Sequence, residues 1–144
     1  MTTRVLAVLA ALAVLAAVVS AWLLYGGGPA GRGMRRLDAG TRESSALAAW
    51  AEAVRQAAPD RQADMVRERF DQTVAEPERE VRTQQIVPAL VRAESHVPAT
   101  VRAGPRGVVR ATWACRSGAP CGPQLTLLFC RAAGGDLRLL GPMP

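Results

Sequence analysis

The sequence predicts an α+β fold: an N-terminal single transmembrane helix, two or three further helices, and then a small antiparallel β-sheet of about three strands. Two observations carry this prediction. An uncharged apolar run precedes segments in which apolar residues recur every three or four positions, and the last third of the chain changes to alternation. The 144 residues therefore divide into a transmembrane anchor at 1–25, a Gly- and Arg-rich flexible tether at 26–40 and one small α+β domain at 41–144.

The anchor is predicted from the run Val5 to Tyr25, which holds 21 residues and no charge. As a helix it spans roughly 31 Å, which matches the hydrocarbon core of a bilayer. Arg4 flanks one end, and Trp22 and Tyr25 fall where aromatic side chains line the membrane interface at the other. We therefore expect residues 5–25 to act as a signal-anchor in the lipid bilayer.

A cleaved signal peptide is the alternative, because Val19-Ser20-Ala21 resembles a peptidase site and would release residues 1–21. The apolar run continues past this site through Trp22 and Leu24, which favours the permanent anchor. Whether the segment is cleaved stays open at this point.

The expected topology is single-pass in the inner (cytoplasmic) membrane, with a cytoplasmic N-terminus and a periplasmic or otherwise extracytoplasmic domain. Arg4 and the very short tail before the anchor favour this orientation. Arg32, Arg35 and Arg36 on the other flank argue for the reverse.

Two amphipathic helices are predicted in the first half of the domain. The first runs from about Ser44 to Ala58, where Leu47, Trp50 and Val54 share one face, and it ends near Pro59. Asp60 is expected to cap the second helix. Its apolar stripe is Met65 or Val66, then Phe70 and Val74.

A third helix is predicted to begin near Pro77, because proline and acidic residues suit the first turn of a helix. We expect Pro88 to kink or divide it before Glu94. The β-prone run 81–87 makes a strand the alternative here.

Strands follow His96. Alternation marks Val109 to Cys115 as one strand, and 125–130 is a second, short and apolar. Two glycines at 134 and 135 predict a tight turn before a further strand at 137–140. Residues 97–102 are expected to add an edge strand. Pro98 has no backbone N–H to donate to a neighbouring strand, which confines proline to the edges of a sheet.

This order of elements is similar in architecture to the NTF2-like periplasmic domains of some secretion-system assembly factors. The resemblance covers the anchor, the helices and the following antiparallel sheet. No residue motif supports it, and it assigns no site residues.

The three cysteines carry the most informative polar chemistry. Cys115 and Cys121 are the disulfide candidate, because they close a short loop that contains Gly and Pro; the bond would contribute about 2–3 kcal/mol. Cys130 is left as an unpaired thiol, buried or joining two chains. Free thiols or a redox or metal role are the alternatives. The C-x5-C spacing differs from redox C-x-x-C, and with His96 the set fits no zinc-ribbon spacing, so no metal site is predicted.

The charge of the chain is bipolar. Residues 37–80 hold six Arg against ten acids, and residues 81–144 hold eight Arg against two. The basic half is expected to attract anions, and its candidate anion-binding residues are Arg102, Arg106, Arg110 and Arg116. Alternatively, it pairs with the acidic half or with a sister copy.

Catalysis is not indicated, because the sequence holds no nucleophile elbow, phosphate-binding loop or H-E-x-x-H motif. No catalytic residues, cofactor or small-molecule substrate are predicted, and nucleic acid is not an expected partner. The expected function is a non-enzymatic, membrane-anchored accessory or assembly subunit of a bacterial envelope complex that binds a partner protein. The alternatives are an anion-binding module for acidic lipid or cell-wall polymer and a thiol redox or metal protein.

Overall fold

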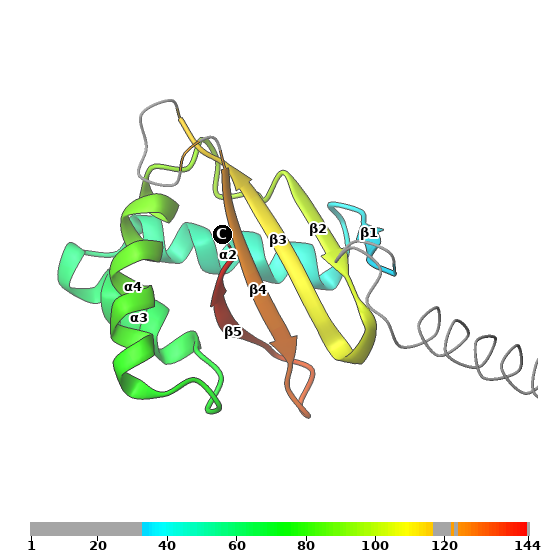
Figure 1. The fold of residues 1–144 in the computed structure, drawn as a ribbon. Coiled ribbons are helices and arrows are strands. Elements are labelled where there is room, and N and C mark those ends of the chain that lie inside the picture. The colour runs from blue at the N-terminus through cyan, green and yellow to red at the C-terminus, as the bar shows by residue number, and fades with distance from the viewer. Residues whose placement is uncertain (1–32, 117–121, 123, 144) are drawn as a thin grey trace, which may run out of the picture. The chain divides into compact units, whose positions relative to one another are not determined.

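The computed structural model describes residues 33–116, 122 and 124–143. The described residues from Met34 onward form one compact unit. Its elements in chain order are β1 (Arg35–Leu37), α2 (Arg42–Gln56), α3 (Pro59–Arg69), α4 (Glu76–Val91), β2 (Thr100–Ala103), a short 3-10 helix (Pro105–Gly107), β3 (Val108–Ala114), β4 (Gln124–Arg131) and β5 (Leu137–Pro142) (Figure 1). The predicted α+β class is confirmed.

The sheet is a simple meander, because its five strands lie side by side in chain order β1-β2-β3-β4-β5. Every neighbouring pair is antiparallel. The prediction of about three strands was therefore too low. The missed strand is β1, which lies inside the segment assigned to the flexible tether and pairs Arg36 with Arg102. Consequently β2 lies between two strands, and the prediction of an edge strand at 97–102 was wrong.

Helix α2 forms where the three-to-four spacing of apolar residues predicts it. Leu47, Ala51 and Val54 are completely buried along one face. The Thr41 side chain accepts a hydrogen bond from the Ser44 amide and so satisfies one of the free donors at the helix start.

Helix α3 begins at Pro59, two residues earlier than it would if Asp60 were its N-cap. Its N-cap is Ala58, and Pro59 takes the first helical position, where the missing N–H costs nothing. Asp60 lies instead in the first turn, where its charge suits the helix dipole. The expectation that Asp60 caps this helix was wrong.

Helix α4 runs unbroken through Pro88, so the expected division at this proline does not occur. Pro88 lies close to the C-terminal end, and the amide of Arg92 still donates to its carbonyl oxygen at 3.2 Å. The run 81–87 therefore lies in a helix and not in the alternative strand, and Ile86 and Leu90 are completely buried on it.

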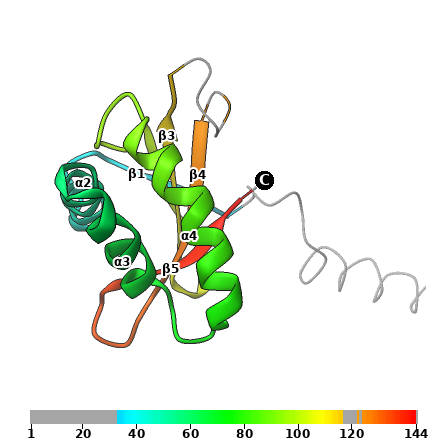
Figure 2. The ribbon, with the colours of Figure 1, turned by 90° about the vertical axis from the view of Figure 1, so that its left-hand side faces the viewer.

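The helices cover one side of the sheet. In Figure 1, α2 passes behind β2, β3 and β4, and no described helix lies in front of them; Figure 2, turned by 90°, shows α2 and α3 on the same side of the strands. The predicted alternation is confirmed, because the inward side chains of β3 are buried, namely Val109, Ala111 and Trp113, and so is Cys115 just past its end. Trp113 is completely buried, and its indole N–H donates to the carbonyl oxygen of His96 at 2.9 Å.

The membrane prediction concerns residues that the structure leaves out. Arg4, Trp22, Tyr25 and the whole run 5–25 lie outside the described residues. In the part of the chain that is described, none of the helices has the length and hydrophobicity that crossing a membrane requires.

Candidate binding surfaces

The side of the sheet turned away from the helices is a candidate binding surface, here called the open face. Side chains on β2, β3 and β4 alternate between the core and this face. The open face comprises Thr100, Arg102, Arg110, Thr112, Thr126 and Leu128, all of them half-buried. It therefore combines positive charge, hydroxyl groups and one large apolar side chain.

Arg102 and Arg110 lie directly opposite each other across the β2–β3 ladder. The neighbouring pair of β3 and β4 is Thr112 and Thr126, whose hydroxyl oxygens are 3.1 Å apart in a hydrogen bond. These four residues, with Thr100, line a hollow of about 330 Å³. The hollow thus places two guanidinium groups beside a row of hydroxyl groups.

The other two predicted anion-binding residues lie elsewhere. Arg106 is exposed at the turn between β2 and β3, and Arg116 is exposed just past the far end of β3. At roughly 3.3 Å per residue, the strand between them separates the two by about 30 Å. The structure brings Arg102 and Arg110 together but does not gather all four arginines into one site.

A second hollow, of about 390 Å³, adjoins the open face beside α4. Its lining is mostly apolar, with Leu128, Leu140, Pro142 and Met143. Arg82 of α4 borders it and donates from Nη1 to the Leu140 carbonyl oxygen. Polar and apolar hollows therefore lie next to each other, joined by Met143, which lines both.

Two of the three cysteines, Cys115 and Cys130, lie among the described residues. Cys130 carries a free thiol, and Cys115 is buried just past the end of β3. Cys121 lies outside the described residues, so the disulfide between Cys115 and Cys121 stays a prediction.

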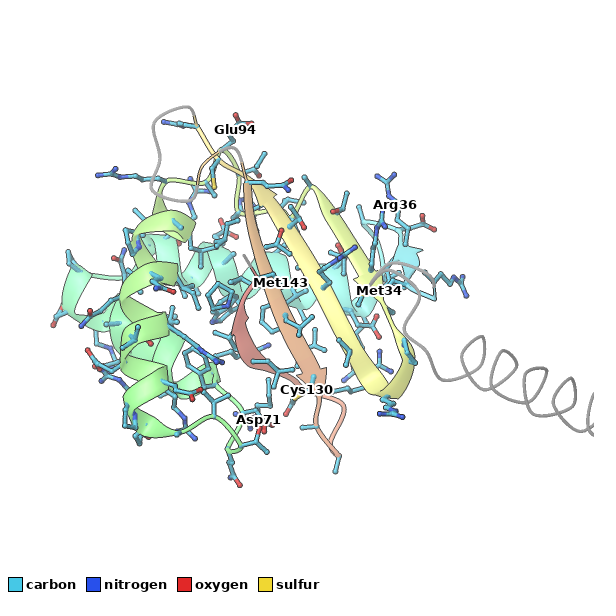
Figure 3. All side chains as sticks on the ribbon, in the orientation of Figure 1. Met34, Arg36, Asp71, Glu94, Cys130 and Met143 are labelled. Atoms are coloured by element: carbon cyan, nitrogen blue, oxygen red, sulfur yellow. The ribbon has the colours of Figure 1, made fainter. Side chains whose placement is uncertain are left out.

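Cys130 is only half-buried, and its Sγ donates to Asp71 Oδ2 at 3.4 Å. Figure 3 shows the two side chains near the end of β4. Burial raises the pKa of the Cys130 thiol, and the hydrogen bond to the Asp71 carboxylate and its negative charge raise it further. A raised pKa keeps the thiol protonated at neutral pH and makes it a poor nucleophile or metal ligand.

His96 does not join the cysteines. Its Nε2 lies 3.9 Å from Glu52 Oε2, and both side chains are substantially exposed. Among the described residues, no group of three or more His, Cys, Asp or Glu side chains is placed to hold a metal ion.

These features define a small α+β domain whose five-stranded sheet is covered by helices on one side. No family model matches the chain, and neither curated proteins nor solved structures give a match. The architectural resemblance to NTF2-like domains therefore gains no support from comparison.

Sequence reasoning missed the pairing that makes the open face a site. Arg102 and Arg110 stand out in the sequence only as two of eight arginines in the basic half. Their juxtaposition depends on the register that the turn at Pro105–Gly107 sets between β2 and β3. The glycines and proline at 104–107 signal a turn but leave that register undetermined.

Proposed function

We propose that this chain is a non-enzymatic, membrane-anchored subunit whose domain binds an acidic segment of a partner protein on the open face. The observation that carries the proposal is the cross-strand pair of Arg102 and Arg110 within a hollow lined by hydroxyl groups. Like charges directly opposite each other destabilise a ladder, and carboxylates that contact both would reverse that effect. The predicted anchor at 5–25 supplies the membrane attachment.

The composition of the face supports a protein partner. Arginine and methionine are enriched at protein interfaces, and here Arg102 and Arg110 share a hollow with Met143, which opens toward Leu128, Leu140 and Pro142. The apolar faces of the helices are not available for docking, because they form the core. Among the described residues, the exposed large hydrophobic side chains are Val81 and Val97 alone, which lie on α4 and in the loop before β2.

Membrane attachment and sidedness are tested with a membrane-impermeant thiol reagent on intact cells, spheroplasts and lysates that contain the full-length chain. Because the Cys130 thiol itself reacts slowly, the reporter is Gln56→Cys, at an exposed position at the end of α2, and its labelling in spheroplasts on a full-length membrane-bound chain is the expected result. Labelling that needs lysis would place the domain in the cytoplasm and overturn the proposed topology. A shortened chain released from the membrane would overturn the anchor.

Partner binding is tested by extracting the full-length chain from membranes in mild detergent and measuring the mass of its complex on native gels. At low salt we expect a complex whose mass is larger than that of the chain alone. At high salt the mass should fall, because salt screens the attraction between exposed charges and the partner dissociates. Arg102→Glu should dissociate the complex, whereas Arg61→Glu, on the exposed surface of α3, should not. Equal behaviour of the two variants would contradict docking on the open face.

A further inference from the structure

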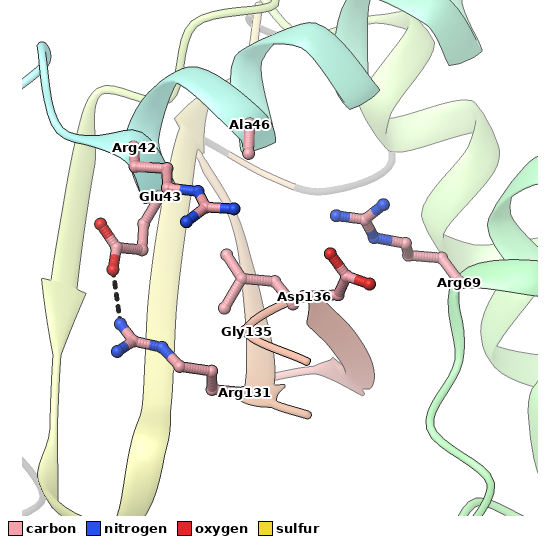
Figure 4. Close-up of a pocket in the computed structure, with 8 residues that line it drawn as sticks. Arg42, Glu43, Ala46, Arg69, Arg131, Gly135 and Asp136 are labelled. Atoms are coloured by element: carbon pink, nitrogen blue, oxygen red, sulfur yellow. Dashed lines mark hydrogen bonds and ion pairs between the residues drawn. The ribbon is translucent and has the colours of Figure 1, made fainter. Parts of the chain in front are cut away.

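A second basic pocket lies away from the open face, between the first turn of α2, the end of α3 and the turn that joins β4 to β5. It has a volume of about 220 Å³, and Figure 4 shows its lining. Its charged side chains are Arg42, Glu43, Arg69, Arg131 and Asp136. Three guanidinium groups therefore meet two carboxylates, which leaves an excess of positive charge.

The three arginines are not equivalent. Arg131 forms an ion pair with Glu43, drawn as a dashed line in Figure 4. Arg42 and Arg69 form no ion pair with any of the described residues. Figure 4 shows both of their guanidinium groups directed into the pocket from opposite sides. The excess positive charge is therefore carried by this pair.

Arg69 is held there at an energetic cost. Its Nε is buried without a hydrogen-bond partner, and its guanidinium carbon lies 5.9 Å from the centre of the Trp50 ring. Burial lowers the pKa of Arg69, repulsion by Arg138 lowers it further, and attraction by Asp136 opposes both. A guanidinium group stays cationic at neutral pH even so. An anion in this pocket would compensate a charge that the fold already keeps partly out of water.

We propose that this pocket binds a phosphate group between Arg42 and Arg69, beside the first turn of α2. The volume of the pocket accommodates one small oxyanion. A phosphate presents oxygens in several directions, so it can accept from both guanidinium groups at once, whereas the two oxygens of a carboxylate lie in one plane. The positive end of the α2 dipole adds to the attraction.

Asp136 gives the proposal a sharp test, because its carboxylate also lines the pocket and attracts Arg69. It follows Gly135, whose φ of +85° shapes the exposed β4–β5 turn. A bound phosphate dianion is repelled by this carboxylate. Asp136→Asn should therefore tighten phosphate binding, whereas Arg42→Gln should weaken it.

The experiment titrates the full-length chain in detergent micelles with sodium phosphate, against sodium chloride at equal ionic strength, by calorimetry. We expect saturable phosphate binding that falls at least about tenfold in Arg42→Gln. Arg61→Gln, an exposed arginine at the other end of α3, is the matched control and should bind as the wild type does. No saturable binding, or equal losses in the two variants, would overturn the proposal.

The same titration with dihexanoyl phosphatidic acid distinguishes the source of the phosphate. Tighter binding of this short-chain lipid than of inorganic phosphate, with the same dependence on Arg42, identifies a phospholipid head group. Equal binding of the two identifies a free phosphate or phosphomonoester. Failure of both probes to bind would show that the pocket is not a phosphate site. The proposed docking on the open face would be unaffected, because the pocket shares no residue with the hollow at Arg102.

Discussion

Arg79 donates from its Nε to the carbonyl oxygen of Val74 at 2.7 Å. The same guanidinium group donates from Nη2 to the Asp71 carbonyl oxygen at 3.3 Å and pairs with Glu76 through Nη1 at 2.9 Å. One side chain in the first turn of α4 therefore binds two carbonyl groups of the connection between α3 and α4. This connection matters for the fold because it positions Asp71 against β5, where the Asp71 amide donates to the Leu139 carbonyl oxygen.

Replacing Arg79 should consequently destabilise the domain. We expect Arg79→Gln to lower the free energy of unfolding by about 1–3 kcal/mol, because two partly buried carbonyl oxygens lose a charged donor. Urea denaturation followed by circular dichroism measures the change. Arg92→Gln, an exposed arginine at the end of α4, is the control and should stay within about 0.5 kcal/mol of the wild type. Equal effects of the two substitutions would show that Arg79 does not stabilise the connection between α3 and α4.

The turn between β2 and β3 offers a stabilising substitution. Arg106 has a φ of 59°, a left-handed conformation that costs most side chains about 1–2 kcal/mol and that asparagine tolerates better. Arg106→Asn should therefore raise the free energy of unfolding by about 0.5–1 kcal/mol, whereas Arg106→Val should lower it. Thermal denaturation of the two variants provides the measurement. The same sign of change in both would show that this turn does not adopt the left-handed conformation.

The Cys130 thiol should react slowly with alkylating reagents. Its pKa is raised by burial and by Asp71, so we expect the midpoint of its alkylation rate against pH to lie above about 8.5, the value of a free cysteine. In Asp71→Asn the midpoint should move to lower pH, because the negative charge beside the thiol is gone. Mass spectrometry of the labelled Cys130 peptide provides the rates. An unchanged profile in Asp71→Asn would contradict the contact.

Asp71 should also make stability depend on pH in the acid range. Hydrogen bonds from the Thr73 amide, from the Thr73 hydroxyl and then from the Cys130 thiol lower the pKa of Asp71. A carboxylate whose pKa is lowered by folding stabilises the folded state at pH values above its pKa in the unfolded chain, which is near 4. That contribution is lost as the pH falls through the pKa of the carboxylate in the folded chain. The wild type should thus exceed Asp71→Asn in free energy of unfolding at pH 6, and the difference should shrink toward pH 2. A difference that is constant over this range would contradict the assignment.

The parts of the fold that follow from short-range patterns could be predicted from the sequence. Alternation of apolar and polar residues predicts a strand at Val109 to Cys115 with one face buried, because successive side chains of a strand point to opposite sides of the sheet. Apolar residues three and four positions apart predict α2 in the same way. Strand β1 escapes such reasoning. Its three residues are too few to show a period, and it forms only by pairing with β2, some sixty residues later in the chain.

The candidate sites depend on long-range geometry and were therefore harder to predict. The sequence picks out Arg102 and Arg110 by charge, but a register shift of one residue would send one of them to the opposite face. The pocket at Arg42, Arg69 and Arg131 has no signal in the sequence, because its three arginines come from three separate elements. Asp71 and Cys130 are likewise 59 residues apart and meet only in the folded domain.

Docking of an acidic partner on the open face can be observed by photo-crosslinking in living cells, with a photoreactive amino acid placed at Thr112 of the full-length chain. Thr112 lies in the hollow beside Arg102 and Arg110, and Gln56, exposed at the end of α2, is the control position. We expect a discrete adduct from Thr112 and none from Gln56. Its partner peptide should be rich in Asp and Glu, and the adduct should disappear in Arg102→Glu and persist in Arg61→Glu. An adduct that is indifferent to Arg102→Glu, or no protein adduct at Thr112, would contradict docking of an acidic partner on the open face.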